Sequence, residues 1–246
     1  MTLGFGEIWR ATFAAVARER SLYLTIAAAF VLLPTVAAAV LGPPEPRNFG
    51  EMRGATLAVQ GLVALIGAVA QLAIARLAWT GGTVGEALGR AAMALPALIA
   101  ATLLTVTALI PAGVLIQLSQ RGIPALLLPG LGVLIPGLWV AARLALTLPI
   151  VAARGVGPIA ALRQSWAATA SNGWRILGLL AALLGVLLGA LLLASGVAAA
   201  AGSVLTLLGG KALAGFLVTL VAGAVGSVYT VYNSVLLATI ARRLIG

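Results

Sequence analysis

The side chains of this sequence that could do chemistry are mostly arginines, which stand singly between long apolar runs. The chain of 246 residues has 15 basic residues and five carboxylates, and it has no histidine and no cysteine. A planar guanidinium donates paired hydrogen bonds to phosphate oxygens, whereas metal binding and acid–base catalysis draw on histidine, cysteine or clustered carboxylates. We therefore expect anion binding and no enzyme activity, and we expect no metal and no cofactor.

Five arginines are the candidate ligands of a lipid phosphate. They stand at or near the ends of apolar runs, on the same predicted side of the membrane. They are Arg76, Arg143, Arg154, Arg163 and Arg175. Apolar sequence continues after Arg143, so this residue lies either inside the bilayer, where an unpaired cation costs a few kcal/mol, or at head-group level, which we favour. The alternative to a phosphate site is a set of solvated arginines that only fix the topology.

Composition indicates an integral membrane protein. Hydrophobic residues make up 62% of the chain and charged residues 8%, and the mean hydropathy is +1.17. Six apolar runs reach the roughly 20 residues that cross a hydrocarbon core of about 30 Å. They are approximately Leu22–Leu41, Gly54–Ala75, Ala91–Leu118, Ile123–Ala142, Ile176–Ala201 and Ala212–Ala241. We predict an all-α, polytopic bundle of six transmembrane helices, forming one domain over residues 1–246.

The basic residues predict the orientation of the bundle. With the N-terminus in the cytoplasm, only four of the 15 fall on the outer side, namely Arg47, Arg53, Arg121 and Lys211. The positive-inside rule therefore predicts that both termini are cytoplasmic. The net charge of +10 then faces anionic lipid head groups. We expect membrane lipids as partners and no nucleic acid, and the sequence identifies no protein partner.

A short amphipathic segment, residues 158–170, separates the fourth and fifth apolar runs. Ile159 and Trp166 fall on one helical face, with Arg163 toward the other. We predict a helix that lies in the membrane interface, where tryptophan side chains act as anchors. The predicted anchors are Trp9, Trp166 and Trp174.

The amphipathic segment has two possible counterparts, which suggests an internal repeat. Similar runs begin near Gly6, Gly85 and Gly157, and each precedes an outward span and a returning span. The predicted repeats are residues 1–80, 81–154 and 155–246. The alternative is that alanine-rich spans ending in arginine look alike by composition alone.

Polar residues inside the apolar runs have two interpretations. Gln60 and Gln71 share a face of the second run, and the sixth run carries Thr219, Thr230, Asn233 and Ser234. The first interpretation, which we favour, is hydrogen bonding between helices. The second is a polar path or ligand pocket lined by Gln60, Gln71 and Asn233, as in a small-molecule transporter or channel-like carrier. Gly185 and Gly189 in the fifth run form a GxxxG pair, for which we predict a packing notch inside the bundle.

The run RLALTLPIVAARGVGPIAALRQSWAATASNGWRILGLL, residues 143–180, resembles the hallmark region of the glycerophosphoryl diester phosphodiesterase membrane-domain family. The matching residues are Arg143, Pro149, Gly157, Pro158, Ser165, Trp166, Trp174 and Arg175. The resemblance implies a six-span protein of the bacterial inner (plasma) membrane. Family members often have a carboxylate where this chain has Arg154, so we expect no role of that carboxylate in this protein.

The resemblance does not imply phosphodiesterase activity for this chain. In the family members that are enzymes, hydrolysis is the work of a separate soluble domain with histidine and acidic residues, and this chain has no histidine. We expect a non-enzymatic membrane protein that binds or organises anionic phospholipid or supports a membrane partner.

Overall fold

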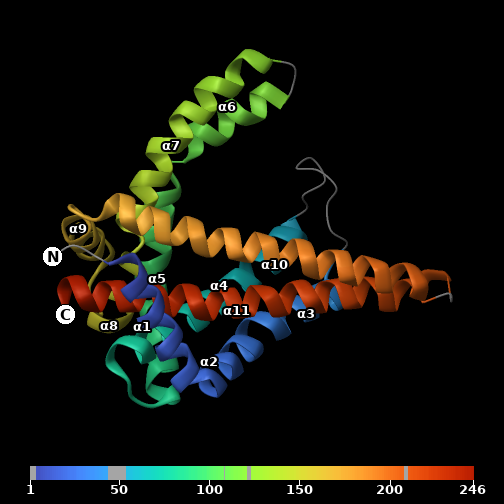
Figure 1. Ribbon diagram of the computed structural model, residues 1–246, viewed down its shortest axis with the longest axis horizontal. Helices are drawn as coiled ribbons and strands as arrows, with labels where there is room; N and C mark the ends of the chain where they lie inside the picture. The colour runs from blue at the N-terminus through green and yellow to red at the C-terminus, as the bar shows by residue number, and fades with distance from the viewer. Residues whose placement is uncertain (1–3, 44–53, 108, 121–122, 208–209) are drawn as a thin grey trace.

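The computed structural model describes residues 4–43, 54–107, 109–120, 123–207 and 210–246. Every regular element in these ranges is helical, and six helical segments are long and apolar enough to cross a membrane. They are Arg20–Leu41, Gly54–Thr80, Val84–Thr107, Leu127–Arg154, Gly173–Thr206 and Leu213–Ile245. The prediction of an all-α, six-span membrane bundle is confirmed (Figure 1).

The first two spans form a hairpin that is preceded by a surface helix. The preceding helix is α1 (Phe5–Arg18). The hairpin consists of α2 (Arg20–Ala27), the π-helical turn η1 (Ala28–Leu32), α3 (Leu33–Leu41) and α4 (Gly54–Thr80). The π turn precedes Pro34, which has no N–H to donate to the turn before it. The N–H of Leu33 instead reaches the carbonyl of Ala28, five residues earlier.

The middle of the chain is more broken than the apolar runs predicted. Its elements are α5 (Val84–Thr107), α6 (Ile110–Gln120), the 3₁₀ turn η3 (Pro124–Leu126), α7 (Leu127–Leu144) and α8 (Thr147–Arg154). The predicted span Ala91–Leu118 is wrong beyond Thr107, because Pro111 has no N–H to donate to the carbonyl of Thr107 and the helix restarts as α6. The amphipathic run near Gly85 is not a separate helix but the first turns of α5.

The last third of the chain begins with the short helix α9 (Pro158–Ala168) and continues with two long helices. These are α10 (Gly173–Leu207) and α11 (Lys211–Ile245), which pack against each other as a hairpin. The predicted short helix between the fourth and fifth spans is therefore present as α9. Of the three amphipathic runs that begin the predicted repeats, two form separate helices, namely α1 and α9.

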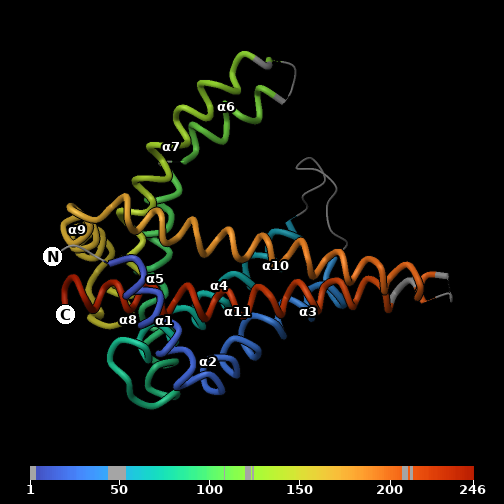
Figure 2. Tube along the Cα trace, viewed as in Figure 1, coloured from blue at the N-terminus to red at the C-terminus, as the bar shows by residue number. Residues whose placement is uncertain are grey.

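Both termini lie at one end of the molecule together with α8 and α9, and we call this the arginine-rich end (Figures 1 and 2). An ion pair joins the termini there, with 3.0 Å between an Nη of Arg243 and an Oε of Glu7. The α10–α11 pair runs from this end to the opposite, distal end, while the α6–α7 hairpin diverges from it (Figure 1). α11 is the central helix, because it contacts α1, α2, η1, α3, α4, α8, α9 and α10.

The packed core is concentrated at the arginine-rich end. In α4 the consecutive residues 72–75 are buried, and in α11 residues 234–241 are buried. The distal half of α10 is exposed instead, as at Val197. Gly185 and Gly189 also face open space, since a Cβ added at either would meet no atom within 4 Å. The predicted GxxxG packing notch inside the bundle is therefore wrong.

Candidate functional site

Arg76, near the end of α4, is held in place by the end of another helix. One Nη of its half-buried side chain donates to the carbonyl oxygen of Ala152 at 3.1 Å, and this carbonyl lies in the last turn of α8. The carbonyl end of a helix carries partial negative charge, which favours a guanidinium there. The described residues accept no hydrogen bond from the Nε or the other Nη of Arg76, so these donors remain available to a ligand.

Arg76 lines a pocket of about 350 Å³, which we call the Arg76–Arg90 pocket. Arg90, in the second turn of α5, lines the same pocket from the opposite helix. The remaining wall consists of small or apolar residues, namely Met93, Ala94, Ala97, Val151, Ala152, Gly155, Val156 and Gly157. The pocket therefore combines two cations with an apolar side.

The turn at the edge of this pocket ends α8 and begins α9. Gly155 adopts the left-handed conformation, with φ of 63°, that ends α8, and Gly157 is the extended N-cap of α9. Among the described residues no side chain caps α9, so the first-turn N–H groups of Ile159 and Ala160 have no capping acceptor there. A helix start with uncapped N–H groups beside two arginines favours an anion.

The side chain of Arg143 forms hydrogen bonds and cation–π contacts with other residues of the protein. Its side chain is only 8% exposed, its Nε donates to Oγ1 of Thr169 at 3.1 Å, and an Nη donates to the carbonyl of Trp166 at 2.7 Å. The guanidinium carbon lies 5.0 Å from the ring centroid of Trp139 and 4.2 Å from that of Trp166, which is cation–π geometry. These contacts join α7 to α9, so Arg143 fixes the position of the short helix.

The other predicted arginines are distributed over the arginine-rich end. Arg154 donates to Oε1 of Gln164 at 3.2 Å and to the carbonyl of Ile245, and it lies 5.8 Å from the ring centroid of Trp79. It therefore ties α8 to α9 and to the end of α11. Arg163 and Arg175 are exposed at the surface of α9 and at the start of α10. The five predicted ligands do not gather in one pocket, and a phosphate role for each stays a prediction.

The predicted tryptophan anchors differ in environment. Trp9 is partly buried and stacks on Phe13 with 5.6 Å between ring centroids. Trp166 and Trp174 are exposed and both contact Trp139, with 5.7 Å and 6.5 Å between ring centroids. On α9 the packed face is Ala161 and Ser165, while Ile159 on the predicted apolar face is 62% exposed. Apolar side chains thus point outward from α9, as an interfacial helix requires.

The polar residues of the sixth span bond within their own helix. The hydroxyls of Thr219, Ser227 and Thr230 donate to carbonyls four residues earlier, at 3.2, 2.8 and 2.9 Å. The predicted hydrogen bonds between helices are wrong for Thr219 and Thr230, because the preceding turn supplies a nearer acceptor. The buried hydroxyl of Ser234 has no hydrogen-bond partner among the described residues.

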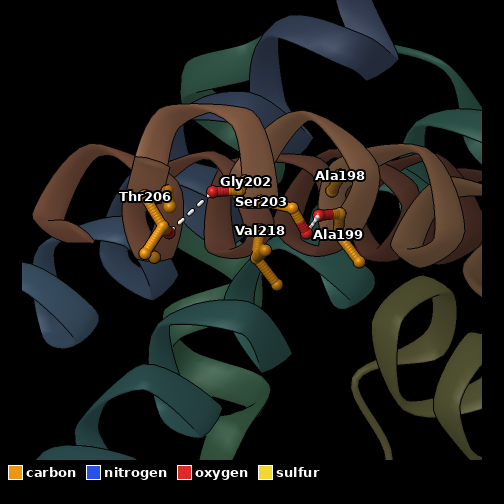
Figure 3. A pocket seen from close by; sticks show the side chains of 8 residues that line it. Ala198, Ala199, Gly202, Ser203, Thr206 and Val218 are labelled. Atoms are coloured by element: carbon orange, nitrogen blue, oxygen red, sulfur yellow. Dashed lines mark hydrogen bonds between the residues drawn. The ribbon is translucent and has the colours of Figure 1, made fainter. Parts of the chain in front are cut away.

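The three residues predicted to line a polar path do not lie together in one groove. Gln60 lines a groove of about 990 Å³ between α3, α4 and α11, whereas Gln71 and Asn233 are partly buried elsewhere and are not among its described lining residues. A shallower hollow of about 570 Å³ lies between α10 and α11 (Figure 3). Its hydroxyls donate within α10, Ser203 to the carbonyl of Ala199 and Thr206 to that of Gly202, so the described lining of this hollow offers no free hydroxyl donor.

Two residues of the site were missed by the sequence analysis. Arg90 was counted for orientation only, because nothing in the sequence indicates that it meets Arg76 across two helices. Trp139 precedes Arg143 by one helical turn, and this spacing was a usable signal for a cation–π pair. Comparisons of the chain with known protein families, with curated proteins and with solved structures give no match.

Proposed function

We propose that this integral membrane protein is not an enzyme and binds anionic phospholipid at its arginine-rich end, with the phosphate in the Arg76–Arg90 pocket. The observation that carries the proposal is one pocket lined by two arginines and by an apolar wall. A phospholipid matches this lining, because it joins an anionic phosphate to apolar acyl chains.

The geometry supports binding in three ways. Arg76 is held by the carbonyl of Ala152 before any ligand arrives, which lowers the entropic cost of binding. Each guanidinium offers planar, paired donors to phosphate oxygens. Met93 and Ala97 belong to α5, a membrane-spanning helix, so an acyl chain can follow this wall into the hydrocarbon.

The proposed binding places the pocket at the cytoplasmic leaflet of a bacterial inner membrane, as the positive-inside rule and the family resemblance suggest. Arg143 is not part of this proposal, because its guanidinium already contacts Thr169 and two tryptophan rings. Support of a membrane protein partner stays a second prediction of the sequence.

Native mass spectrometry with dioleoylphosphatidylglycerol and dioleoylphosphatidylcholine tests the proposal. We expect the Arg76→Gln/Arg90→Gln variant to bind phosphatidylglycerol about tenfold more weakly, as the loss of charge-assisted hydrogen bonds implies. The matched control is Arg163→Gln/Arg242→Gln, which removes the same charge from exposed positions at the same end and should retain binding.

Two outcomes would contradict this function. Equal weakening in both variants would show a diffuse attraction between lipid and surface charge. Displacement of phosphatidylglycerol by millimolar inorganic phosphate would identify a soluble anion, rather than a lipid, as the ligand of the pocket.

A further inference from the structure

We propose that the groove between α3, α4 and α11 binds the ester-linked acyl region of a glycerolipid from the leaflet opposite the Arg76–Arg90 pocket. The groove lies at the distal end and shares no lining residue with that pocket. Its volume of about 990 Å³ is that of a pocket for a sizeable small molecule. This second site does not depend on the proposed phosphate site.

A close helix contact and small side chains together define the groove. At Gly223, α11 approaches the first span so closely that an added Cβ would lie 2.8 Å from Cδ1 of Leu32. Nearer the distal end, the groove is lined by small residues such as Gly215 on α11 and Ala38 and Ala39 on α3. The missing side-chain volume at these positions leaves room for a ligand.

The described lining is apolar apart from one amide and three threonines. Apolar side chains such as Val59, Val63 and Phe216 provide most of the wall. The hydroxyls of two of the threonines are already used, since Thr35 donates to the carbonyl of Val31 at 2.7 Å and Thr219 donates to that of Gly215 at 3.2 Å.

Gln60 is the residue that identifies the ligand. Its exposed carboxamide makes no hydrogen bond with the described residues, so both of its N–H donors face the groove or its surroundings unpaired. Inside a bilayer there is little water to accept these hydrogen bonds, and an unpaired donor is costly. The ester carbonyls of a glycerolipid are the acceptors that a membrane supplies.

Gln60 lies closer to the ester layer of the opposite leaflet than to the middle of the bilayer. From position 60 to position 76 of α4, the rise of 1.5 Å per residue gives about 24 Å, compared with a hydrocarbon core of about 30 Å. With Arg76 at the edge of the core in one leaflet, Gln60 lies about 6 Å inside the far edge, well past the middle of the bilayer. A lipid of the opposite leaflet can therefore place an ester beside Gln60 and an acyl chain along the apolar wall.

Photo-cross-linking in nanodiscs tests this site with two zwitterionic probes. The first is a diester phosphatidylcholine with a diazirine on one acyl chain, and the second is its diether analogue, which lacks the carbonyl acceptors. We expect the diester probe to label α3 and the distal halves of α4 and α11 about threefold more than the diether probe, the effect of one hydrogen bond. The Gln60→Leu variant should label equally with both probes.

Three control variants test whether the labelling depends on the groove and on the amide of Gln60. Gln117→Leu removes an exposed glutamine of α6, outside the groove, and should keep the preference for the diester probe. Ala39→Phe fills the groove and should reduce its labelling by both probes. The Arg76→Gln/Arg90→Gln variant should label normally in the groove, so failure of the phosphate site leaves this result unchanged.

Three results would overturn the inference. The first is even labelling of the groove and of the lipid-exposed face of α10, and the second is an unchanged diester preference in Gln60→Leu. The third is a cross-link between two protein chains through groove residues, which would show that a second copy occupies the groove.

Discussion

Gly173 lies against the side chain of Arg143 so closely that a Cβ at position 173 would stand 2.9 Å from the Cδ of Arg143. The glycine is the first residue of α10, and the arginine is near the end of α7. The absence of a side chain at Gly173 thus leaves room for the buried arginine between two helices and a pair of tryptophan rings.

Gly173→Ala should destabilise the protein by about 1–3 kcal/mol, the usual cost of overpacking. The guanidinium of Arg143 is held by Thr169 and Trp166, so its methylene groups cannot simply move aside. Thermal unfolding in detergent checks this prediction against Gly178→Ala, where an added Cβ meets no atom within 4 Å. Equal melting temperatures for the two variants would contradict it.

Arg143→Lys should destabilise the protein by about 1–3 kcal/mol, even though the charge is kept. Lysine has no planar group to lie over the ring of Trp166 and cannot reproduce both hydrogen bonds. Arg163→Lys, at an exposed position of α9, is the matched control. Chemical denaturation followed by tryptophan fluorescence measures both variants, and similar midpoints would show that charge alone matters at position 143.

The carbonyl oxygen of Arg143 accepts a hydrogen bond from the hydroxyl of Ser165 at 2.8 Å, and the hydroxyl of Thr169, which lies 3.0 Å away, can donate either to it or to the carbonyl of Ser165 at 2.8 Å. Either hydroxyl can satisfy this carbonyl at the break between α7 and α8. Ser165→Ala should therefore cost about 1 kcal/mol and Thr169→Val about 1–3 kcal/mol, because the latter also removes the acceptor of the Arg143 Nε, and the double variant should cost more than their sum. A double-mutant cycle of unfolding free energies measures the coupling, and strict additivity would show that the two bonds act independently.

Gly185→Ala and Gly189→Ala should leave stability unchanged or raise it by up to about 1 kcal/mol each. A Cβ added at either position would meet no atom of the described residues within 4 Å, and alanine is the better helix former. Melting temperatures of the two variants check this expectation. A clear loss of stability would mean that these glycines pack against another molecule.

Hydropathy and helix length were sufficient to predict the six spans, because each crossing needs a minimum run of apolar residues. They could not predict the breaks at η1 and between α5 and α6, since these depend on single backbone hydrogen bonds. Pro34 and Pro111 were the usable signals, because a proline removes the N–H that would continue the helix.

The site was less predictable than the fold. Arg76 was a candidate because it ends an apolar run, but its pocket requires Arg90 from the next helix and the turn at Gly155. A contact of this kind between two helices leaves no periodic pattern in the sequence. For Thr219 and Thr230 the prediction was wrong, because a hydroxyl in a helix can reach a carbonyl of its own preceding turn.

The central position of α11 has a consequence for biosynthesis. α11 follows every helix that it contacts, so the residues buried against it lack that neighbour until α11 has entered the membrane, although α4 can already pack against α5 and α8. The earlier spans can therefore associate during synthesis, but the part of the core that α11 provides is completed only after translation has passed α11.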